Sequence, residues 1–351
     1  MEKLSILYLG VESGTSRHRA QALRRLGHDV CVVDPDGLLP NRRVIGYWMQ
    51  RAGGDFLAGL ARRRVLNAIG SREFDLALVN GGMLVDAALV TALKQRCGMV
   101  LNYNNDDPFG RRDGAKWRLY LEALPIYDQA IVVRECNVRE ALAAGARDVL
   151  RVYMSADEVA HAPRPLTRED RDRWGSRVVF IGTWMPERGP FLARLIDCGV
   201  PLAIFGDRWH KAGEWPLLRT HWRGPGLIAD DDYAKAVQCA GVCLGLLSKG
   251  NRDQSTTRSF EIPHLRGVLC AERTPEHLAL YRENVEAVFW SGPEECAEKC
   301  RELLGDEAWR ERLAGNGHAR CGENRTLNES MLRNALAKAM KVSRREAAVS
   351  A

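Results

Sequence analysis

The chain has 351 residues, of which 46% are hydrophobic and 27% are charged, as in soluble globular proteins. Its length predicts two domains. The net charge of +6 comes from arginines scattered along the chain, which argues against a nucleic acid partner and suits an anionic ligand or peripheral contact with an anionic membrane surface.

The ten cysteines lie mostly in apolar runs and form no Cys-x-x-Cys pair. This usage is typical of reduced, buried thiols and argues against a disulfide framework or a zinc site. Cys296 and Cys300 have helical i, i+4 spacing without a second pair, so we interpret them as packing residues. The first apolar strand starts too early for a signal peptide, and no apolar run reaches the roughly 18 residues that span a bilayer. We therefore expect a cytoplasmic location.

The first half of the chain alternates strand and helix patterns. This alternation predicts a parallel sheet covered on both faces by helices. Strands are expected at residues 4–9, 29–33, 74–79, 99–103, 127–133 and 149–153, and helices at 17–26, 44–69, 87–95 and 137–144.

Polar loops follow several of these strands, where open α/β sheets bind ligands. The loop after the first strand contains Gly14, Thr15 and Ser16 and precedes His18. Its glycines lack the G-x-G-x-x-G spacing of a dinucleotide site, although Asp34 after the second strand resembles the acid of that motif. We predict acceptor binding by Gly14, Thr15 and Ser16 instead.

A second alternating set follows a Pro-rich, charged linker. Strands are expected at 177–181, 202–205, 241–247, 268–271 and 287–290, with helices at 191–198, 230–239, 257–265, 293–304, 307–320 and 327–341. The predicted organisation is therefore a first domain at 1–155, a linker at 156–175, a second domain at 176–326, a terminal helix at 327–342 and a disordered tail at 343–351. Two such domains facing each other would enclose a cleft.

The most informative stretch is residues 251–276, which reads as loop, helix, glycine stop and strand. Hydroxyl residues that could cap the helix precede it: Ser255, Thr256 and Thr257. A helix start attracts phosphate, whereas the carboxylates of Asp253 and Glu261 accept hydrogen bonds from sugar hydroxyls. Phosphates together with sugars indicate a nucleotide sugar or a dinucleotide.

Residues 180–290 resemble the nucleotide-sugar half of a GT-B glycosyltransferase, an architecture of two Rossmann-like domains. The resemblance is strongest to CgeB-like (spore maturation protein-type) enzymes with a group 1 glycosyl transferase C-terminal domain. It is carried by the segments at 180–188, 205–209, 257–264 and 267–274, which read FIGTWMPER, FGDRW, TRSFEIPH and GVLCAERT.

The resemblance implies that the domain at 176–326 binds the nucleotide sugar and that the domain at 1–155 binds the acceptor. It also implies a role for each matching donor residue. Glu261 would hold the ribose hydroxyls and Asp253 would lie near the sugar, although the family has Glu at that position. Arg188, which follows Gly182 and the first strand of this domain, would contact the diphosphate. Thr183 replaces a usual Arg, so we expect Lys249 or Arg258 to supply the missing charge.

The chemistry requires stabilisation of a leaving nucleoside diphosphate, which helix N–H groups and Arg188 can provide without a metal ion. No convincing Asp-x-Asp motif is present, so no cofactor is predicted beyond the nucleoside diphosphate sugar itself as donor. An inverting enzyme would also need a general base. The candidates are Asp107, Asp106 and His18, with turn formation as the structural alternative for the two aspartates.

The predicted function is therefore transfer of a sugar to an acceptor that is a protein, a glycan, a lipid-linked glycan or a small molecule. The alternatives are a nucleotide-sugar epimerase, a non-catalytic nucleotide-sugar-binding protein and an NAD-dependent oxidoreductase, the last disfavoured by the glycine spacing.

Overall fold

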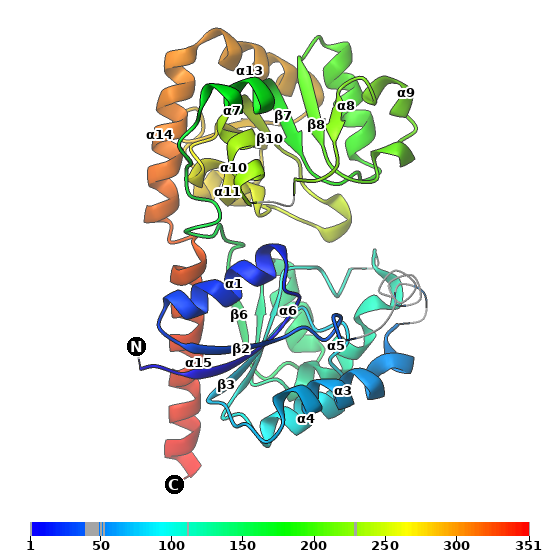
Figure 1. The fold of residues 1–351 in the computed structure, drawn as a ribbon, viewed down its shortest axis with the longest axis vertical. Helices are drawn as coiled ribbons and strands as arrows, with labels where there is room; N and C mark the ends of the chain where they lie inside the picture. The colour runs from blue at the N-terminus through cyan, green and yellow to red at the C-terminus, as the bar shows by residue number, and fades with distance from the viewer. Residues whose placement is uncertain are drawn as a thin grey trace. The chain divides into compact units, whose positions relative to one another are not determined.

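The computed structural model describes residues 2–38, 49, 51, 53–110, 112–227 and 230–350, with side chains described as far as residue 341. The chain forms two compact units. Unit 1 comprises Met1–Tyr153, Gly250–Arg252 and Asn328–Ala351, and unit 2 comprises Met154–Lys249 and Asp253–Leu327. Figure 1 labels their helices and strands.

Unit 1 contains six parallel strands in the order β2-β1-β3-β4-β5-β6. The strands are β1 (Ser5–Leu9), β2 (Asp29–Val33), β3 (Leu76–Asn80), β4 (Val100–Asn104), β5 (Gln129–Val132) and β6 (Val149–Arg151), and the helices between them are α1 (Gly14–Arg25), α3 (Asp55–Ile69), α4 (Ala87–Lys94), α5 (Arg118–Ala123) and α6 (Glu135–Ala143). The helix predicted at 44–69 is observed from Asp55 onward, and residues 44–48, 50 and 52 lie outside the described part of the chain.

The C-terminal helix α15 (Asn328–Ser350) packs against α1 in unit 1. Glu329 near its start accepts from Arg25 near the end of α1 at 2.6 Å. The helix spans the predicted terminal helix and continues over 343–350, the segment for which the sequence predicts disorder.

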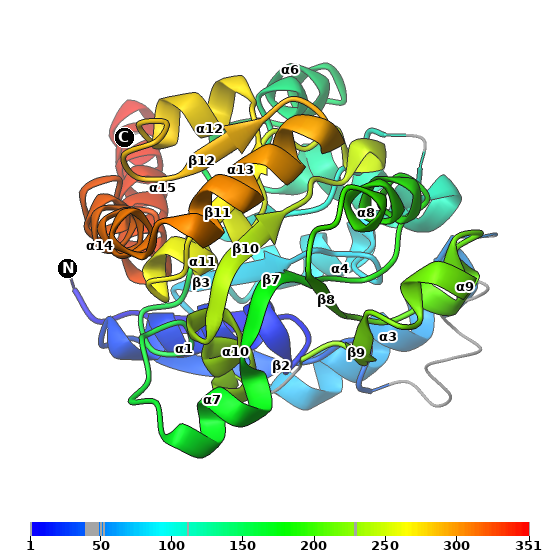
Figure 2. The same ribbon diagram turned by 90° about the horizontal axis from the view of Figure 1, so that it is seen from above.

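Unit 2 contains a second parallel sheet, in the order β12-β11-β10-β7-β8-β9. The strands are β7 (Ser176–Ile181), β8 (Leu202–Phe205), β9 (Trp222–Gly224), β10 (Ala240–Gly245), β11 (Leu269–Glu272) and β12 (Val288–Trp290), and the helices are α7 (Arg168–Trp174), α8 (Arg188–Asp197), α9 (Trp215–Leu218), α10 (Asp230–Gln238), α11 (Arg258–His264), α12 (Pro275–Leu280), α13 (Pro293–Gly305) and α14 (Glu307–Glu323). Helices α8 and α13 pack together on one face, and α10 and α7 lie on the other (Figure 2).

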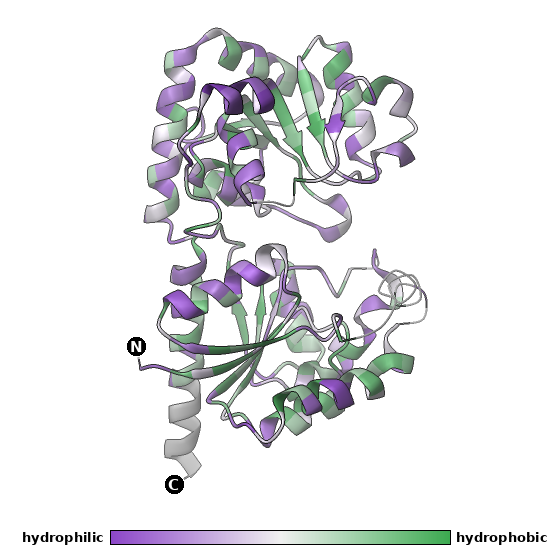
Figure 3. Ribbon diagram, viewed as in Figure 1, coloured by the Kyte–Doolittle hydropathy of each residue, from purple (hydrophilic) through white to green (hydrophobic). Residues whose placement is uncertain are grey.

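The central strands of both sheets are buried and mostly apolar, whereas the edge strand β9 is largely exposed and polar residues concentrate on the covering helices (Figure 3). Helices on both faces explain why the strands read as continuous apolar runs and not as alternating patterns. None of the helices that the structure describes combines the length and the apolarity needed to cross a bilayer.

Helix α7 lies within the segment predicted as a linker. The Thr167 hydroxyl accepts from the Asp170 backbone N–H at 3.1 Å, and the Asp170 carboxylate accepts from the Thr167 N–H at 3.0 Å, which forms a capping box. Trp174 at its end is buried 6.0 Å from the Phe205 ring. The sequence analysis missed this helix because its residues are mostly charged and only one aromatic side chain, Trp174, is buried.

The carboxyl ends of β7 and β8 approach closely at two glycines. Gly182 donates its N–H to the Phe205 carbonyl at 2.9 Å. Gly206 has φ of +152°, and a Cβ atom there would overlap the Gly182 carbonyl. Only glycine therefore allows both the backbone conformation and the close approach.

We expect Gly206→Ala to lower the free energy of unfolding by about 3 kcal/mol or more, because strain and overlap act together. Gly199→Ala has the positive φ of +79° but open space around it, so its cost should be about 1–2 kcal/mol. Gly213→Ala has neither feature and should change stability by under about 0.5 kcal/mol. Urea denaturation measures all three, and equal costs at Gly206 and Gly199 would contradict the close approach.

Candidate functional site

The strand order of unit 2 reverses between β7 and β10. From this point β7-β8-β9 extend in one direction and β10-β11-β12 in the other. Open α/β sheets bind ligands outside the carboxyl ends of their strands at such a switch point. Three predicted donor-binding residues, Gly182, Arg188 and Lys249, follow these two strands in the sequence.

Arg188 connects the ends of β7 and β10. It is the first residue of α8 and is 8% exposed. Its Nη1 donates to the Thr183 carbonyl at 2.8 Å, and its Nη2 donates to the Leu246 carbonyl at 3.2 Å. Both of these acceptors are neutral carbonyls, and the two bonds fix the guanidinium at the switch point.

Arg258, the first residue of α11, brings a second guanidinium to the end of β7. Its Nε donates to the Ile181 carbonyl at 3.2 Å. Its guanidinium carbon lies 4.6 Å from the centroid of the Tyr233 ring, and its Nη1 pairs with the Glu261 carboxylate. The end of β7 therefore contacts two arginines, one from α8 and one from α11.

Glu261 lies in the interior of unit 2, at 1% exposure. Its Oε2 accepts from the Tyr233 hydroxyl at 3.0 Å and from Arg258, and its Oε1 lies 3.5 Å from His161 Nε2. Burial alone would raise the pKa of Glu261, but the charges of Arg258 and His161 and the hydrogen bonds outweigh burial and lower it. Protein groups therefore contact both carboxylate oxygens of Glu261, the residue predicted to bind the ribose.

The residues before α11 form local contacts. Ser255 donates its hydroxyl to Glu276 Oε2 at 2.6 Å, and the Thr256 N–H donates to Ser259 Oγ at 3.0 Å. Thr257 stands at the N-cap in helical conformation, without a capping bond from its side chain. Ser259, the second residue of α11, thus accepts the N–H of Thr256, and the side-chain cap predicted for Thr257 is not formed.

Asp253 is 7% exposed, and its backbone N–H donates to the Ser248 carbonyl at 3.2 Å. It thus closes the turn that connects β10 to α11. Lys249, at the other end of this turn, has a side chain 56% exposed and pairs with Glu272. Of the predicted cationic donor residues, Lys249 is accordingly the one with the most accessible charge.

A cavity of 230 Å³ lies at this edge of unit 2. It is lined by Glu187, Arg188, Phe191, Leu246, Leu247, Lys249, Glu272, Trp290, Ser291, Gly292 and Pro293. The rings of Phe191 and Trp290 stack with centroids 4.6 Å apart, and Trp290 Nε1 is buried without a hydrogen-bond partner among the described residues. Cations, aromatic rings and an unsatisfied donor thus occur in one cavity wall.

A larger hollow of 920 Å³ in unit 2 contains none of the predicted donor residues. Its lining includes Ser176 and Leu202, at the amino ends of β7 and β8, together with Trp174 and Arg223. It also includes Phe205 and Gly224, at the carboxyl ends of β8 and β9. Because none of the predicted donor residues lines it, volume alone does not identify the site.

In unit 1, the predicted acceptor residues stand at the start of α1. Gly14 has φ of +51°, and Thr15 Oγ1 accepts from Arg19 at 3.4 Å. Ser16 is 3% exposed, with its Oγ 3.2 Å from the Tyr8 hydroxyl. Of the three, Ser16 is therefore committed to internal packing.

Arg19 is a residue that the sequence analysis missed. It is 2% exposed, donates from Nε to Asn80 Oδ1 at 3.0 Å, and stacks its guanidinium 4.3 Å from the Tyr103 ring centroid. Asn104 Nδ2, at the end of β4, is buried without a partner among the described residues. The spacing of Arg19 on α1 places it on the sheet-facing side, but arginines on helices are usually solvated.

His18 and Asp106, two of the predicted general bases, differ in solvent exposure. His18 is 4% exposed, and its Nε2 lies 3.4 Å from Arg17. Asp106 has a side chain 39% exposed, 3.9 Å from Lys116 Nζ. Its backbone N–H donates to Asn104 Oδ1 at 2.9 Å, an Asx turn that is formed by the side chain of Asn104 and not by that of Asp106.

The third predicted base, Asp107, is held by an ion pair within unit 1. Arg252 donates from Nε to Oδ2 at 2.6 Å and from Nη2 to Oδ1 at 2.8 Å, and Asn137 donates to Oδ1 at 2.9 Å. Burial raises the pKa of Asp107, but Arg252 and Asn137 together lower the pKa by more than burial raises it, so the net shift is downward. Arg252 also pairs with Glu140 at 2.7 Å. Asp107 is thus an ionised carboxylate with both oxygens engaged.

Comparison with known proteins relates unit 2 to sugar transfer. Residues 188–336, most of unit 2 and the beginning of α15, match a family model described as glycosyl transferase-like. No curated protein matches the sequence. The CgeB-like subtype stays a prediction.

Solved structures match nearly the whole chain. Sucrose-phosphate synthase from Thermosynechococcus elongatus has a TM-score of 0.70 at 12% identity, covering 97% of this chain and 100% of the other. HepE from Anabaena in complex with UDP-glucose has a TM-score of 0.64 at 11%, covering 95% and 100%. A protein assigned as a UDP-N-acetylglucosamine 2-epimerase from Listeria monocytogenes has 0.54 at 12%, covering 93% and 95%. These matches and the two parallel sheets confirm the predicted GT-B fold of two Rossmann-like domains.

The buried pair of Glu261 and Arg258 makes stability depend on pH. Because the folded pKa of Glu261 is lowered, its contribution is present above the unfolded value of about 4.3 and is lost as pH falls through the folded pKa. We expect Glu261→Gln to cost about 1.5–3 kcal/mol at pH 7, since it removes a charged hydrogen-bond partner from Arg258, whose side chain is 31% exposed.

Urea denaturation from pH 7 downward checks this expectation. The difference between wild type and Glu261→Gln should shrink below the unfolded pKa of about 4.3. Glu302→Gln, whose exposed carboxylate pairs with Lys299 on the surface of α13, should cost under about 1 kcal/mol. A Glu261→Gln cost as small as that of this control would show that the buried pair does not stabilise the fold.

Proposed function

We propose that the chain is a glycosyltransferase that transfers a sugar from a nucleoside diphosphate sugar to an acceptor hydroxyl. The observation that carries this proposal is the pair of guanidiniums, Arg188 and Arg258, at the switch point of the unit that matches the glycosyl transferase-like model. The GT-B fold supports it.

In this proposal Arg188, Arg258 and Lys249 bind the diphosphate. Arginine presents a planar fork of donors that matches phosphate oxygens, and lysine adds a mobile point charge. The proposed site includes Ser255, Thr256 and Thr257, which precede α11, and Gly182, which follows β7. Since HepE was solved with UDP-glucose, uridine diphosphate compounds are the first donors to test.

The predicted ribose contact of Glu261 requires a change from the present arrangement. Its oxygens are engaged by Arg258 and Tyr233, so a ribose would have to displace one of them. The contacts of Glu261 favour a second role, in which it orients Arg258 toward the diphosphate. The sugar contact of Asp253 stays as predicted from the sequence.

The reaction breaks the bond between the anomeric carbon and the phosphate oxygen and forms a bond from that carbon to the acceptor oxygen. Negative charge develops on the β-phosphate as the bond breaks, and fixed guanidiniums stabilise it. If the enzyme inverts, a base takes the acceptor proton. Among Asp106, Asp107 and His18, exposure favours Asp106 because its carboxylate is open to an incoming hydroxyl.

The alternative is a nucleotide-sugar epimerase, a function that the printed name of one neighbour with this fold, from Listeria monocytogenes, assigns to that protein. An epimerase isomerises the sugar of the donor without an acceptor. Incubating each candidate donor alone and analysing the sugar by NMR separates the two functions, since a transferase returns the donor unchanged or hydrolysed.

Donor binding tests the cationic cavity. Lys249→Met should raise the Kd for UDP about tenfold, because one charge-assisted contact of about 1.5 kcal/mol is lost. Lys299→Met, which removes a lysine from a Glu pair elsewhere on unit 2, should leave the Kd unchanged. Isothermal calorimetry measures both. Absence of binding by every uridine, guanosine and thymidine diphosphate compound, or equal affinity in wild type and Lys249→Met, would contradict the proposed donor site.

Transfer is expected to need no divalent ion. The acidic run Asp230–Asp232 forms the first turn of α10, where carboxylates favour the helix dipole, and Asp231 pairs with Arg164 at 2.8 Å. We therefore expect the transfer rate to be the same in EDTA as in buffer, measured as UDP release with an accepted acceptor. A loss of activity in EDTA that Mn²⁺ restores would refute metal independence.

A further inference from the structure

Arg19 places a positive charge in the interior of unit 1. It lies on α1, is 2% exposed, and has its guanidinium carbon 4.3 Å from the centroid of the Tyr103 ring. Its Nε donates to Asn80 Oδ1 at 3.0 Å, and its Nη2 donates to Thr15 Oγ1 at 3.4 Å. Asn80 ends β3 and pairs in register with Tyr103 on β4. These contacts hold the guanidinium at the carboxyl ends of two neighbouring strands.

No carboxylate balances this charge. Among the residues that the structure describes, none forms an ion pair with Arg19, and both of its hydrogen-bond acceptors are neutral. The nearest acid along the chain, Glu12, is exposed, and the first turn of α1 contains no acid. Because a buried charge is costly unless it is paired, the fold leaves this arginine in need of an anion.

The phenol of Tyr8 does not supply the negative charge. Tyr8 lies on β1, close enough for Arg19 to act on its pKa. Burial raises the pKa of Tyr8 by more than the charge of Arg19 and the hydrogen bonds lower it, so the net shift is upward. The hydroxyl therefore stays neutral, and it donates to the Ser16 carbonyl at 2.9 Å.

The start of α1 adds a second positive feature. The bond of Arg19 to Thr15, one turn earlier, directs the guanidinium to the amino end of its own helix. The helix dipole is positive there, and basic side chains are favoured at the opposite end, where α1 has Arg24 and Arg25. The side chain of Ser13, at the N-cap, forms no capping bond. A buried cation and an uncapped helix start thus coincide, and an anion would stabilise both.

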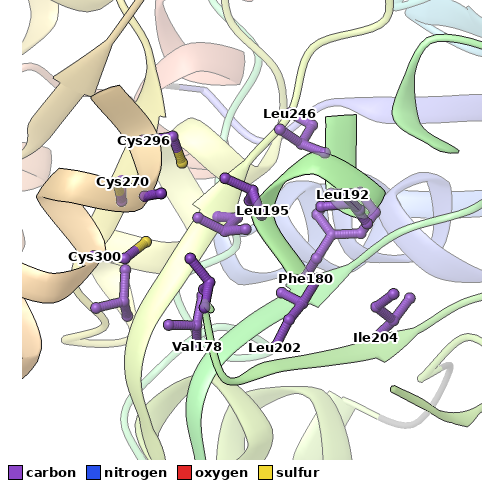
Figure 4. Packing of buried hydrophobic residues seen from close by; sticks show 14 of the residues in the cluster. Val178, Phe180, Leu192, Leu195, Leu202, Ile204, Leu246, Cys270, Cys296 and Cys300 are labelled. Carbon is purple, nitrogen blue, oxygen red and sulfur yellow. The ribbon is translucent and has the colours of Figure 1, made fainter. Parts of the chain in front are cut away.

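Packing does not require an arginine between helix and sheet. In unit 2 the helix that follows the first strand is α8, and it covers the sheet with apolar side chains. Leu192 and Leu195 from α8 lie beside Phe180 and Val178 from β7 in one core cluster (Figure 4). In unit 1, Arg19 occupies the same layer between the first helix and the sheet. Ligand binding explains this difference, whereas filling of the core does not.

Several donors in this region remain for a ligand. Arg19 Nη1 forms no hydrogen bond within the described part of the chain, and it is not among the fully buried unpaired atoms. Asn80 is half-buried, and because its Oδ1 accepts from Arg19, its Nδ2 is left as a donor. A Cβ atom on Gly14 would meet nothing within 4 Å, so the helix start is open. Guanidinium, amide and helix N–H donors at the carboxyl ends of parallel strands suit a phosphate.

We propose that Arg19, Asn80 and the start of α1 bind a phosphate group that the acceptor carries. Phosphate fits better than carboxylate because it brings more charge and three acceptor oxygens to these donors. The acceptor of the transfer is accordingly a phosphorylated molecule. Its assignment as the acceptor rests on the proposed sugar transfer, whereas the phosphate site does not.

Calorimetric titration of the full-length chain with inorganic phosphate tests the site, without UDP and then at saturating UDP. We expect one phosphate per wild-type chain in both titrations, because UDP occupies the proposed donor site in unit 2. Arg19→Met should raise the Kd for phosphate at least about tenfold, since a charge-assisted contact is lost. Arg24→Met, which removes an exposed arginine from the other end of α1, should retain the wild-type Kd.

Asn80→Asp provides a second variant that keeps Arg19 in place. Its carboxylate would lie where Asn80 Oδ1 is now, 3.0 Å from Arg19 Nε, and would supply the missing negative charge. We expect this variant to unfold at a higher urea concentration than the wild type at pH 7 without phosphate, and to bind phosphate at least about tenfold more weakly. Asn67→Asp, on the exposed side of α3, should change neither property.

The outcomes separate the phosphate site from the sugar transfer. Absence of saturable phosphate binding by the wild type, equal Kd values in Arg19→Met and Arg24→Met, or a wild-type Kd in Asn80→Asp overturns the site. Tighter binding of acetate than of phosphate overturns the choice of anion. Phosphate binding that UDP abolishes overturns the assignment to the acceptor. Phosphate binding that depends on Arg19 in a chain that binds no UDP supports the site and contradicts the proposed transfer.

Discussion

The site in unit 2 depends on how the backbone carbonyls at the ends of β7 and β10 are satisfied. Buried carbonyl groups need donors, and here the carbonyls of Ile181, Thr183 and Leu246 accept from arginine side chains. Arginine satisfies this need and keeps its charge. The same contacts that complete the sheet therefore fix two positive groups where a parallel sheet reverses its strand order.

The position of one of these groups depends on a buried acid. Arg258 pairs with Glu261, and Glu261 also accepts from Tyr233 on α10. The carboxylate thus links α10 and α11 and sets the direction of the guanidinium that contacts β7. An acid at this place on α11 serves the fold whether or not it contacts a ligand, so its presence in the sequence does not by itself distinguish the two roles.

The sequence predicted most of the architecture because the strands are continuous apolar runs followed by glycine or polar residues, and this pattern is local. It did not reveal β9, which has three residues, or α7, which one tryptophan anchors. It also placed Glu261 on the correct helix but did not indicate that its side chain is buried. The pair of Asp107 and Arg252, 145 positions apart, requires tertiary structure.

The departures from the family pattern are consistent with this geometry. Thr183 stands where the resemblance to group 1 glycosyl transferases leads us to expect arginine. The sequence analysis predicted that Lys249 or Arg258 supplies the missing positive charge. Lys249 has an exposed side chain paired with Glu272, whereas Arg258 is bonded to the Ile181 carbonyl, two residues before the altered position. A guanidinium held at the end of β7 by α11 occupies the neighbourhood that an arginine at 183 would reach. On the proposed function, Arg258 therefore replaces the missing charge, and Lys249 adds a mobile one.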